Sequence, residues 1–255
     1  MTVVYRARRR ASGSQVEVRM GARGRALRVD GSLASWYAPG SAITGSVWDA
    51  LAAPLLALPP SRRRSVLILG LGGGSAARVV RALAPAAQIV GVERDQRVLR
   101  AARRWFDLDD LGVRVVEADA LLYLRRAKRR FDAVLEDVFV GRGRAVHKPA
   151  WLPTPGLDLA ARRLVRGGVL ASNGLDEFDS VAREMRRLFP ATLRIGVEGY
   201  DNRIAVGSTR RLDARRLRSS VAADATLAPT AARLSFRTGA RRLRGRLRGT
   251  AERRD

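Results

Sequence analysis

The sequence predicts an α/β protein built on a doubly wound, mostly parallel sheet of seven strands. From residue 65 to residue 207, short apolar runs alternate with amphipathic segments of helical period. A glycine-rich turn follows the first apolar run, and acidic residues follow the next three. Repeated strand–helix units of this kind make successive strands parallel and cover both faces of the sheet with helices.

The elements are predicted in chain order. The N-terminal region predicts short strands over 15–20 and 26–29, then a helix over 46–58 that Pro54 interrupts. Strands are expected at the apolar runs 66–69, 89–92, 113–116, 131–135 and 168–172. Helices are expected over 76–83, 95–105, 121–126, 157–165 and 180–188. The last two strands, 193–197 and 203–206, are joined by a hairpin signal, so the final strand should run antiparallel to its neighbour.

Composition divides the chain into three parts. Residues 1–60 form a small N-terminal β-region with a gate helix, residues 61–207 form the α/β domain, and residues 208–255 form an Arg-rich tail that we expect to be flexible. The chain has 255 residues and a formal net charge of +25. Two explanations of this charge stay open. One is a nucleic acid or an anionic surface that the ends contact, and the other is an Arg-dominated codon usage without function.

The rare residues exclude several kinds of chemistry. The chain has no Cys, which excludes disulfides, thiolate catalysis and Cys-based zinc sites, and it has one His, His147, which excludes a multi-His metal site. We therefore expect no metal. No N-terminal signal segment and no apolar run of membrane-spanning length is found, so a soluble, cytoplasmic protein without a membrane span is expected.

A glycine loop marks the predicted ligand site. Gly70, Gly72 and Gly74 lie between the first strand of the α/β domain and its helix, where glycines let a ligand approach the backbone and the helix N-terminus. Glu93 ends the next strand, 23 residues after Gly70. An acid about 20 residues downstream of such a loop is placed to accept hydrogen bonds from a ribose diol. The pair predicts a nucleoside-containing ligand at the carboxyl edge of the sheet.

Two further acids follow the next strands. Asp119 follows the third strand and Asp137 the fourth, so both are expected along the same edge. The structural alternative for each is a helix N-cap or a solvated turn residue. Their succession beside the glycine loop favours a site.

Four segments, at 66–75, 92–95, 117–120 and 131–137, resemble the spermidine synthase-like (polyamine aminopropyltransferase-like) branch of the class I AdoMet-dependent methyltransferase fold. The resemblance covers about residues 15–207. It implies that Gly70, Gly72, Gly74 and Glu93 hold the nucleoside of S-adenosylmethionine (AdoMet) or decarboxylated AdoMet, and that Asp119 and the amide of Ala120 bind the adenine. It also implies that Asp137 lies beside the transferred group and helps to deprotonate an attacking amine.

The sequence departs from that family at the amine pocket. Gly73 stands where the family carries an Asp that faces the amine end of decarboxylated AdoMet. Segment 47–49 reads Val-Trp-Asp in place of Tyr-His-Glu, and the acid after Asp137 is lost. The carboxylates that remain for the pocket are expected to be Asp137, Asp49 and Glu136, too few to favour spermidine synthesis, since a polyamine needs several.

Three functions stay open. The first is a transferase that moves a methyl or an aminopropyl group from AdoMet or decarboxylated AdoMet to a small-molecule amine acceptor, as a monomer or a homodimer. The second is a non-catalytic nucleoside- or nucleic-acid-binding protein with a degenerate transferase domain. The third is an NAD-dependent dehydrogenase, which the loop and Glu93 permit but in which Asp119 has no role and Ser75 replaces the third glycine of the fingerprint.

Overall fold

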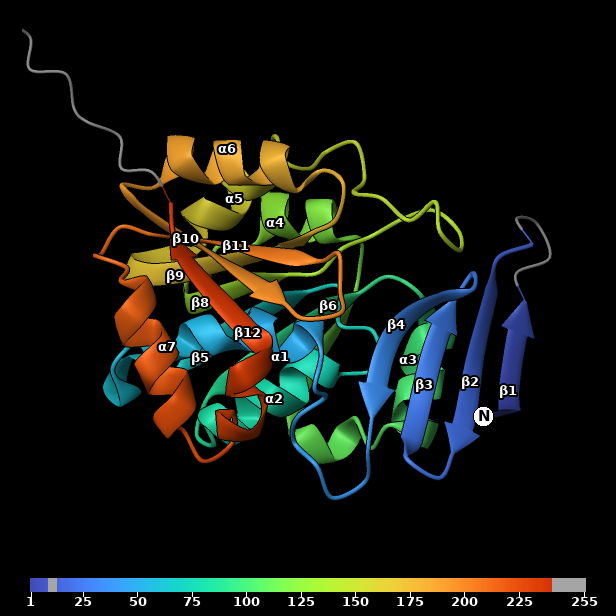
Figure 1. The fold of residues 1–255 in the computed structure, drawn as a ribbon. Coiled ribbons are helices and arrows are strands. Elements are labelled where there is room, and N and C mark those ends of the chain that lie inside the picture. Colours follow the sequence, from blue (N-terminus) through green and yellow to red (C-terminus); the bar gives the residue numbers. More distant parts are fainter. Residues whose placement is uncertain (9–12, 240–255) are drawn as a thin grey trace, which may run out of the picture.

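The computed structural model of the chain describes residues 1–8 and 13–239. Two sheets lie side by side (Figure 1). The N-terminal sheet is antiparallel, and its strands follow chain order: β1 (Thr2–Arg8), β2 (Gln15–Gly21), β3 (Gly24–Val29) and β4 (Ser32–Tyr37). Strands β2 and β3 confirm the predicted β-region. Strands β1 and β4 were not predicted; the side chains of β1 are mostly exposed and show no apolar alternation.

The large sheet has eight strands in the order β12-β10-β11-β9-β8-β5-β6-β7. Five strands are mutually parallel: β5 (Ser65–Leu69), β6 (Gln88–Glu93), β7 (Val113–Glu117), β8 (Phe131–Glu136) and β9 (Leu164–Gly174). Strand β11 (Arg203–Ser208) lies between β9 and β10 (Ala191–Val197) and runs antiparallel to both. The doubly wound, mostly parallel sheet is therefore confirmed, as is the antiparallel run of the last predicted strand, β11, against its neighbour.

Both faces of the large sheet are buried. In β5, Val66 and Ile68 pack into one core, with α1 (Val47–Ala52) and α2 (Ser75–Leu83). Leu67 and Leu69 pack into the other, under α4 (Ala120–Arg126), α5 (Gly156–Arg162) and α6 (Phe178–Leu188) (Figure 1). Burial on both faces explains why the strands are continuous apolar runs.

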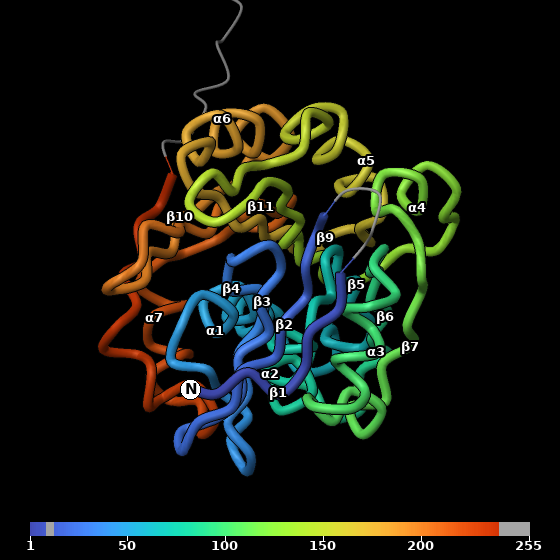
Figure 2. The backbone as a smooth tube through the Cα atoms, turned by 90° about the vertical axis from the view of Figure 1, so that its right-hand side faces the viewer, coloured from blue at the N-terminus to red at the C-terminus, as the bar shows by residue number. Residues whose placement is uncertain are grey.

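A third core joins the two sheets. Helix α3 (Gln96–Trp105) turns Val98 and Ala101 toward the N-terminal sheet, where Val16 and Leu27 lie. Figure 2 is viewed from the side on which this sheet lies and shows α3 beside it. The helix turns Leu99 toward the core of the large sheet. The N-terminal strands are thus fixed beside the glycine loop rather than free to swing.

Short 3₁₀ segments complete the connections. The helix predicted over 46–58 ends at Ala52 and continues as the 3₁₀ helix η1 (Ala53–Ala57), which begins just before Pro54 as the sequence had suggested. Two more 3₁₀ segments lie before the C-terminal region: η2 (Pro60–Arg62) precedes β5, and η3 (Asp109–Leu111) precedes β7. Among the described residues, no helix is long and apolar enough to cross a bilayer.

The expectation of a flexible tail from residue 208 is wrong over most of its described length. Residues 214–238 form α7 (Ala214–Ala223), η4 (Ala228–Arg233) and β12 (Leu234–Thr238). Strand β12 pairs with β10 and makes the sheet eight-stranded rather than seven-stranded. Four apolar side chains anchor this segment in the core: Leu217, Val221, Leu227 and Leu234. The Arg-dense run 241–248 lies outside the described residues.

Candidate functional site

A cavity of about 650 Å³ lies at the carboxyl edge of the parallel strands. Strand order fixes the sequence of side chains along this edge. Asp119 follows β7, Glu93 ends β6, the glycine loop follows β5, Asp137 follows β8 and Asn173 is the last residue but one of β9. The turn between β10 and β11 adds Tyr200 and Asn202, and β4 closes the front.

Glycines allow close packing at the loop. Gly70, Gly72 and Gly74 have φ of 80°, 54° and 87°, a region that suits glycine. A Cβ on Gly70 would lie 2.5 Å from the carbonyl oxygen of Asp137, and one on Gly72 would lie 2.8 Å from Oγ of Ser35. Gly70 and Gly72 line the cavity, whereas Gly74 lies against Leu108 and Leu111 and does not.

Glu93 lines the cavity and also fixes the loop. Its Oε2 accepts the N–H of Gly72 at 3.0 Å, and its Oε1 accepts those of Arg94 and Asp95 at 2.9 and 3.0 Å. Burial raises the pKa of Glu93, while these backbone hydrogen bonds favour its charged form. A carboxylate offers about four acceptor positions, so Glu93 retains capacity for a ligand hydroxyl.

Asp119 is a helix cap, as the structural alternative proposed, and it also lines the cavity. Its Oδ1 accepts the N–H groups of Leu121 and Leu122 at 2.9 and 3.1 Å, at the start of α4. Both bonds go to Oδ1, which leaves Oδ2 for a donor on a ligand. Ala120, the first residue of α4, lines the same wall.

Asp137 lies at the middle of the edge, held by side chains from two other elements. The indole Nε1 of Trp48 donates to its Oδ2 at 2.9 Å, and Nδ2 of Asn173 donates to its Oδ1 at 2.8 Å. Nδ2 of Asn202 in turn donates to Oδ1 of Asn173 at 3.0 Å. Burial raises the pKa of Asp137 to about 6, against the lowering effect of Asn173, Lys148 and Trp48. Such a carboxylate can take up and release a proton near neutral pH.

Asp49 and Glu136, expected in the same pocket, do not line the cavity. Asp49 is fully buried and accepts the N–H groups of Thr44 and Gly45, each at 2.8 Å, at the start of α1. Glu136 is fully buried and pairs with Nζ of Lys148 at 2.8 and 3.0 Å. The carboxylates of both acids therefore bind groups of the protein itself and do not face a ligand in the cavity.

Lys148 anchors the loop that follows β8. Its Nζ also donates to the carbonyl of Val138 at 3.1 Å and lies 3.9 Å from the ring centroid of Phe139. Trp151, farther along this loop, lines the cavity, while His147 is exposed and does not. The loop thus forms a fixed wall of the cavity beside Asp137.

Sequence reasoning missed Trp48, Asn173 and Lys148 as site residues. Asn173 was detectable, because it is a polar residue near the carboxyl end of a strand, the signal that identified the acids. Lys148 is one of only two Lys in a chain rich in Arg. The family resemblance placed segment 47–49 at the amine pocket, but the contact of Trp48 with Asp137 gave no local signal, because it joins segments 89 residues apart.

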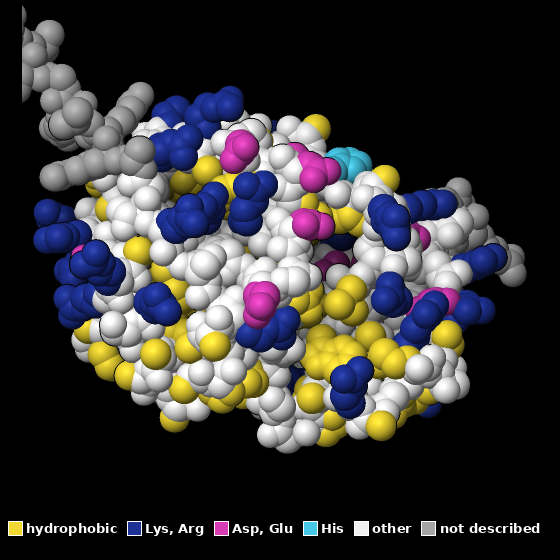
Figure 3. All heavy atoms as spheres, viewed as in Figure 1, with side chains coloured by type: hydrophobic (Ala, Val, Ile, Leu, Met, Phe, Trp, Pro, Cys, Tyr) yellow, Lys and Arg dark blue, Asp and Glu magenta, His cyan; other side chains and the backbone are white. Residues whose placement is uncertain are grey.

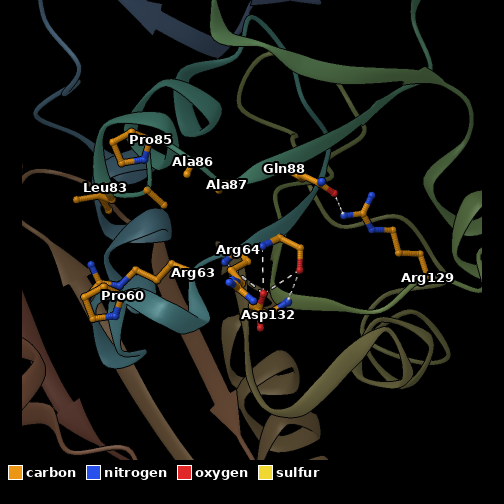
Figure 4. Close-up of a pocket in the computed structure, with 12 residues that line it drawn as sticks. Pro60, Arg63, Arg64, Leu83, Pro85, Ala86, Ala87, Gln88, Arg129 and Asp132 are labelled. Atoms are coloured by element: carbon orange, nitrogen blue, oxygen red, sulfur yellow. Dashed lines mark hydrogen bonds between the residues drawn. The ribbon is translucent and has the colours of Figure 1, made fainter.

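A second hollow, of about 760 Å³, lies at the opposite edge of the sheet, at the amino ends of β5 and β6 (Figure 4). Its one lining acid, Asp132, already accepts the N–H of Ser65 at 3.1 Å and its hydroxyl at 2.9 Å. Ligands of open α/β sheets bind at the carboxyl ends of strands, so the cavity around Asp137 is the candidate site.

The strand order, with antiparallel β11 inserted between β9 and β10, and the carboxyl-edge cavity define the class I AdoMet-dependent methyltransferase fold. Comparison with known proteins confirms the resemblance to spermidine synthases within this class. A probable polyamine aminopropyl transferase of Bifidobacterium longum is 35% identical over 98 residues, 38% of this chain and 21% of that protein. An eEF1A lysine and N-terminal methyltransferase of Danio rerio is 30% identical over 154 residues, 55% of this chain and 22% of that protein. The matches thus span about a fifth of these curated relatives.

Solved structures share the fold over most of the chain. A probable spermidine synthase from Corynebacterium glutamicum has a TM-score of 0.72 at 18% identity, covering 93% of this chain and 90% of that one. A spermidine synthase in complex with the transition-state analogue AdoDATO has a TM-score of 0.68 at 19% identity, covering 88% and 78%. Human methyltransferase-like protein 13 in complex with SAH has a TM-score of 0.57 at 24% identity, covering 73% and 90%. No protein-family model matches the chain.

Proposed function

We propose that this protein is a transferase that binds AdoMet at the carboxyl-edge cavity and moves its methyl group to an amine held by Asp137. One observation carries the proposal: Gly70, Gly72, Glu93, Asp119 and Asp137 line a single cavity of about 650 Å³. Small-molecule sites occupy about 300–1,000 Å³, so the volume suits a nucleoside together with an acceptor. The names of the curated relatives describe group transfer, one of them to lysine and N-terminal amines.

The nucleoside half of the cavity fits the donor. Glu93 is placed for the ribose hydroxyls, since one of its oxygens already fixes the loop beneath them. Oδ2 of Asp119 is placed for the exocyclic amine of adenine, and Ala120 lies beside it at the start of α4. These are the assignments that the family resemblance implies, and the cavity brings all three residues to one wall.

For this reaction the protein needs only to align the donor with the acceptor and to accept a proton. A sulfonium donor supplies its own leaving group: the amine nitrogen forms a bond to the methyl carbon as the carbon–sulfur bond breaks, and the electron pair stays on sulfur. Asp137 orients the amine and accepts its proton, which passes to water. Trp48 and Asn173 fix the Asp137 carboxylate, so its geometry is set before the acceptor enters.

The glycine loop favours intact AdoMet over the decarboxylated form. The N–H of Gly73 donates to Oγ of Ser35 at 2.6 Å, and a Cβ at Gly73 would lie 2.9 Å from Cβ of Ser35. An aspartate therefore does not fit here while β4 keeps its place. Without that acid the loop has no partner for the amine of decarboxylated AdoMet and no repulsion toward the carboxylate of AdoMet.

Aminopropyl transfer is the second candidate, because a curated relative and two of the structures carry that activity in their names. Calorimetric titration of the purified protein with AdoMet, decarboxylated AdoMet and NAD separates the candidates. We expect AdoMet to bind at least about tenfold more tightly than decarboxylated AdoMet, because the ammonium of AdoMet is paired with its own α-carboxylate whereas that of the decarboxylated form finds no carboxylate in the loop. The reverse order would support aminopropyl transfer, and binding of NAD alone would contradict both.

A further inference from the structure

The acceptor half of the cavity is aromatic and holds one carboxylate. Along the edge, the strands β7, β6 and β5 carry the nucleoside residues, whereas the acceptor half is formed by β8 and the loop after it, β9, the β10–β11 turn and α1. Four aromatic residues line this second half: Trp48, Phe139, Trp151 and Tyr200. Its remaining polar groups include the amides of Asn173 and Asn202. Apolar and aromatic walls favour an acceptor with an apolar body.

The charges around this half disfavour a second ammonium group. Among the described residues that line this half, Asp137 is the one carboxylate, and Arg28 and Arg144 line the cavity from the side of the N-terminal sheet and the β8 loop. Glu136 and Asp49 are buried in bonds of their own. Burying a charge without a partner costs several kcal/mol. The Asp137 carboxylate can offset this cost for one ammonium group, and this half of the cavity has no second carboxylate for another.

A neighbouring hollow does not change this balance. It shares Leu175, Tyr200 and Asn202 with the cavity and is lined by the acids Asp176, Glu198 and Asp201. These acids are exposed to solvent and share the hollow with Arg203 and Arg233. Exposed carboxylates bind an ammonium weakly, because water competes for both charges.

From this arrangement we propose that the acceptor is a monoamine, a single amino group on an apolar or aromatic body, and not a polyamine. The inference rests on the proposed function, since the amine must meet the donor beside Asp137. The amino group lies against the Asp137 carboxylate and its carbon body against the aromatic walls. The same walls reject a second ammonium at the far end of the acceptor.

A matched pair of probes tests the proposal: n-hexylamine and 1,6-diaminohexane, which have the same carbon chain and differ by one amine. Each is titrated into the full chain saturated with S-adenosylhomocysteine at pH 8, where Asp137 is ionised, since its pKa is about 6. We expect hexylamine to bind at least about tenfold more tightly. Equal or tighter binding of the diamine would overturn the proposal, as would binding of neither amine.

A pair of variants supplies a second, independent readout. Leu175 is partly exposed and lines this half of the cavity. Leu175→Glu places a carboxylate at a position that is less exposed than the acids of the neighbouring hollow and should reduce the preference for hexylamine about tenfold, whereas the neutral control Leu175→Gln should keep it. If both variants shift the preference equally, charge does not decide the selectivity and the proposal fails. Absence of S-adenosylhomocysteine binding in the wild type would instead overturn the proposed function itself.

Discussion

The position of the Asp137 carboxylate is fixed by contacts between distant parts of the chain. The sequence placed it at the strand edge, but its state is set by Trp48 from α1 and Asn173 from β9, at 2.9 and 2.8 Å. Burial raises its pKa to about 6, and the hydrogen bonds from Asn173 and Trp48 oppose this rise. A motif shows which residue type follows a strand, and it does not show which side chains converge on that residue in the fold.

The raised pKa of Asp137 predicts an acidic limb in the rate of transfer. The carboxylate form accepts the proton, so kcat/KM should fall as pH drops through about 6, where Asp137 becomes protonated. Asp137→Asn should lower kcat by about 10²–10⁴ and abolish this limb, because the amide cannot act as a base.

The control is nucleoside affinity in the same variant, because Asp137 lies outside the nucleoside half of the cavity. Binding of S-adenosylhomocysteine to Asp137→Asn should stay within about twofold of the wild type. An unchanged rate with an unchanged pH profile would remove Asp137 from the reaction and favour a non-catalytic nucleoside-binding protein.

At the scale of elements, the α/β domain was predictable and the C-terminal segment was not. The strand β5 is an apolar run buried on both faces, which gives a strong signal. The core residues of α7, Leu217 and Val221, lie one turn apart, and the segment 208–218 at the start of this region contains five Arg. The high charge of this segment obscured the apolar period of an amphipathic helix. The pairing of β12 with β10, about 40 residues apart in the chain, gave no local signal.

The buried face of α7 predicts a large effect of truncating its core side chain. Leu217→Ala should lower the free energy of unfolding by about 2–5 kcal/mol, because the side chain is 2% exposed and leaves a cavity. The neighbouring Arg218→Ala, on the exposed face, should change it by no more than about 0.5 kcal/mol. Chemical denaturation of both variants measures the difference, and equal values would contradict the packing of α7 against the sheet.

For the whole molecule, the net charge of +25 was the most conspicuous feature of the sequence, yet it says little about the site. Lys and Arg side chains are spread over the face in Figure 3 rather than gathered over one element. The cavity is instead lined by acids at strand ends, which favour the cationic donor that we propose for it. Contact of the Arg-rich ends with nucleic acid or an anionic surface stays a prediction, and the run 241–248 lies outside the described residues.

We propose that the carboxyl-edge cavity binds an S-adenosyl nucleoside through Glu93. Calorimetric titration of S-adenosylhomocysteine into the wild type, Glu93→Ala and the exposed-acid control Glu198→Ala measures this contribution. We predict that Glu93→Ala weakens binding about 10- to 100-fold, because the ribose loses a charged acceptor and the Gly72 N–H loses its partner. Glu198→Ala should bind as the wild type does. Equal affinity of Glu93→Ala and the wild type, or no binding by any of the three, would contradict the claim.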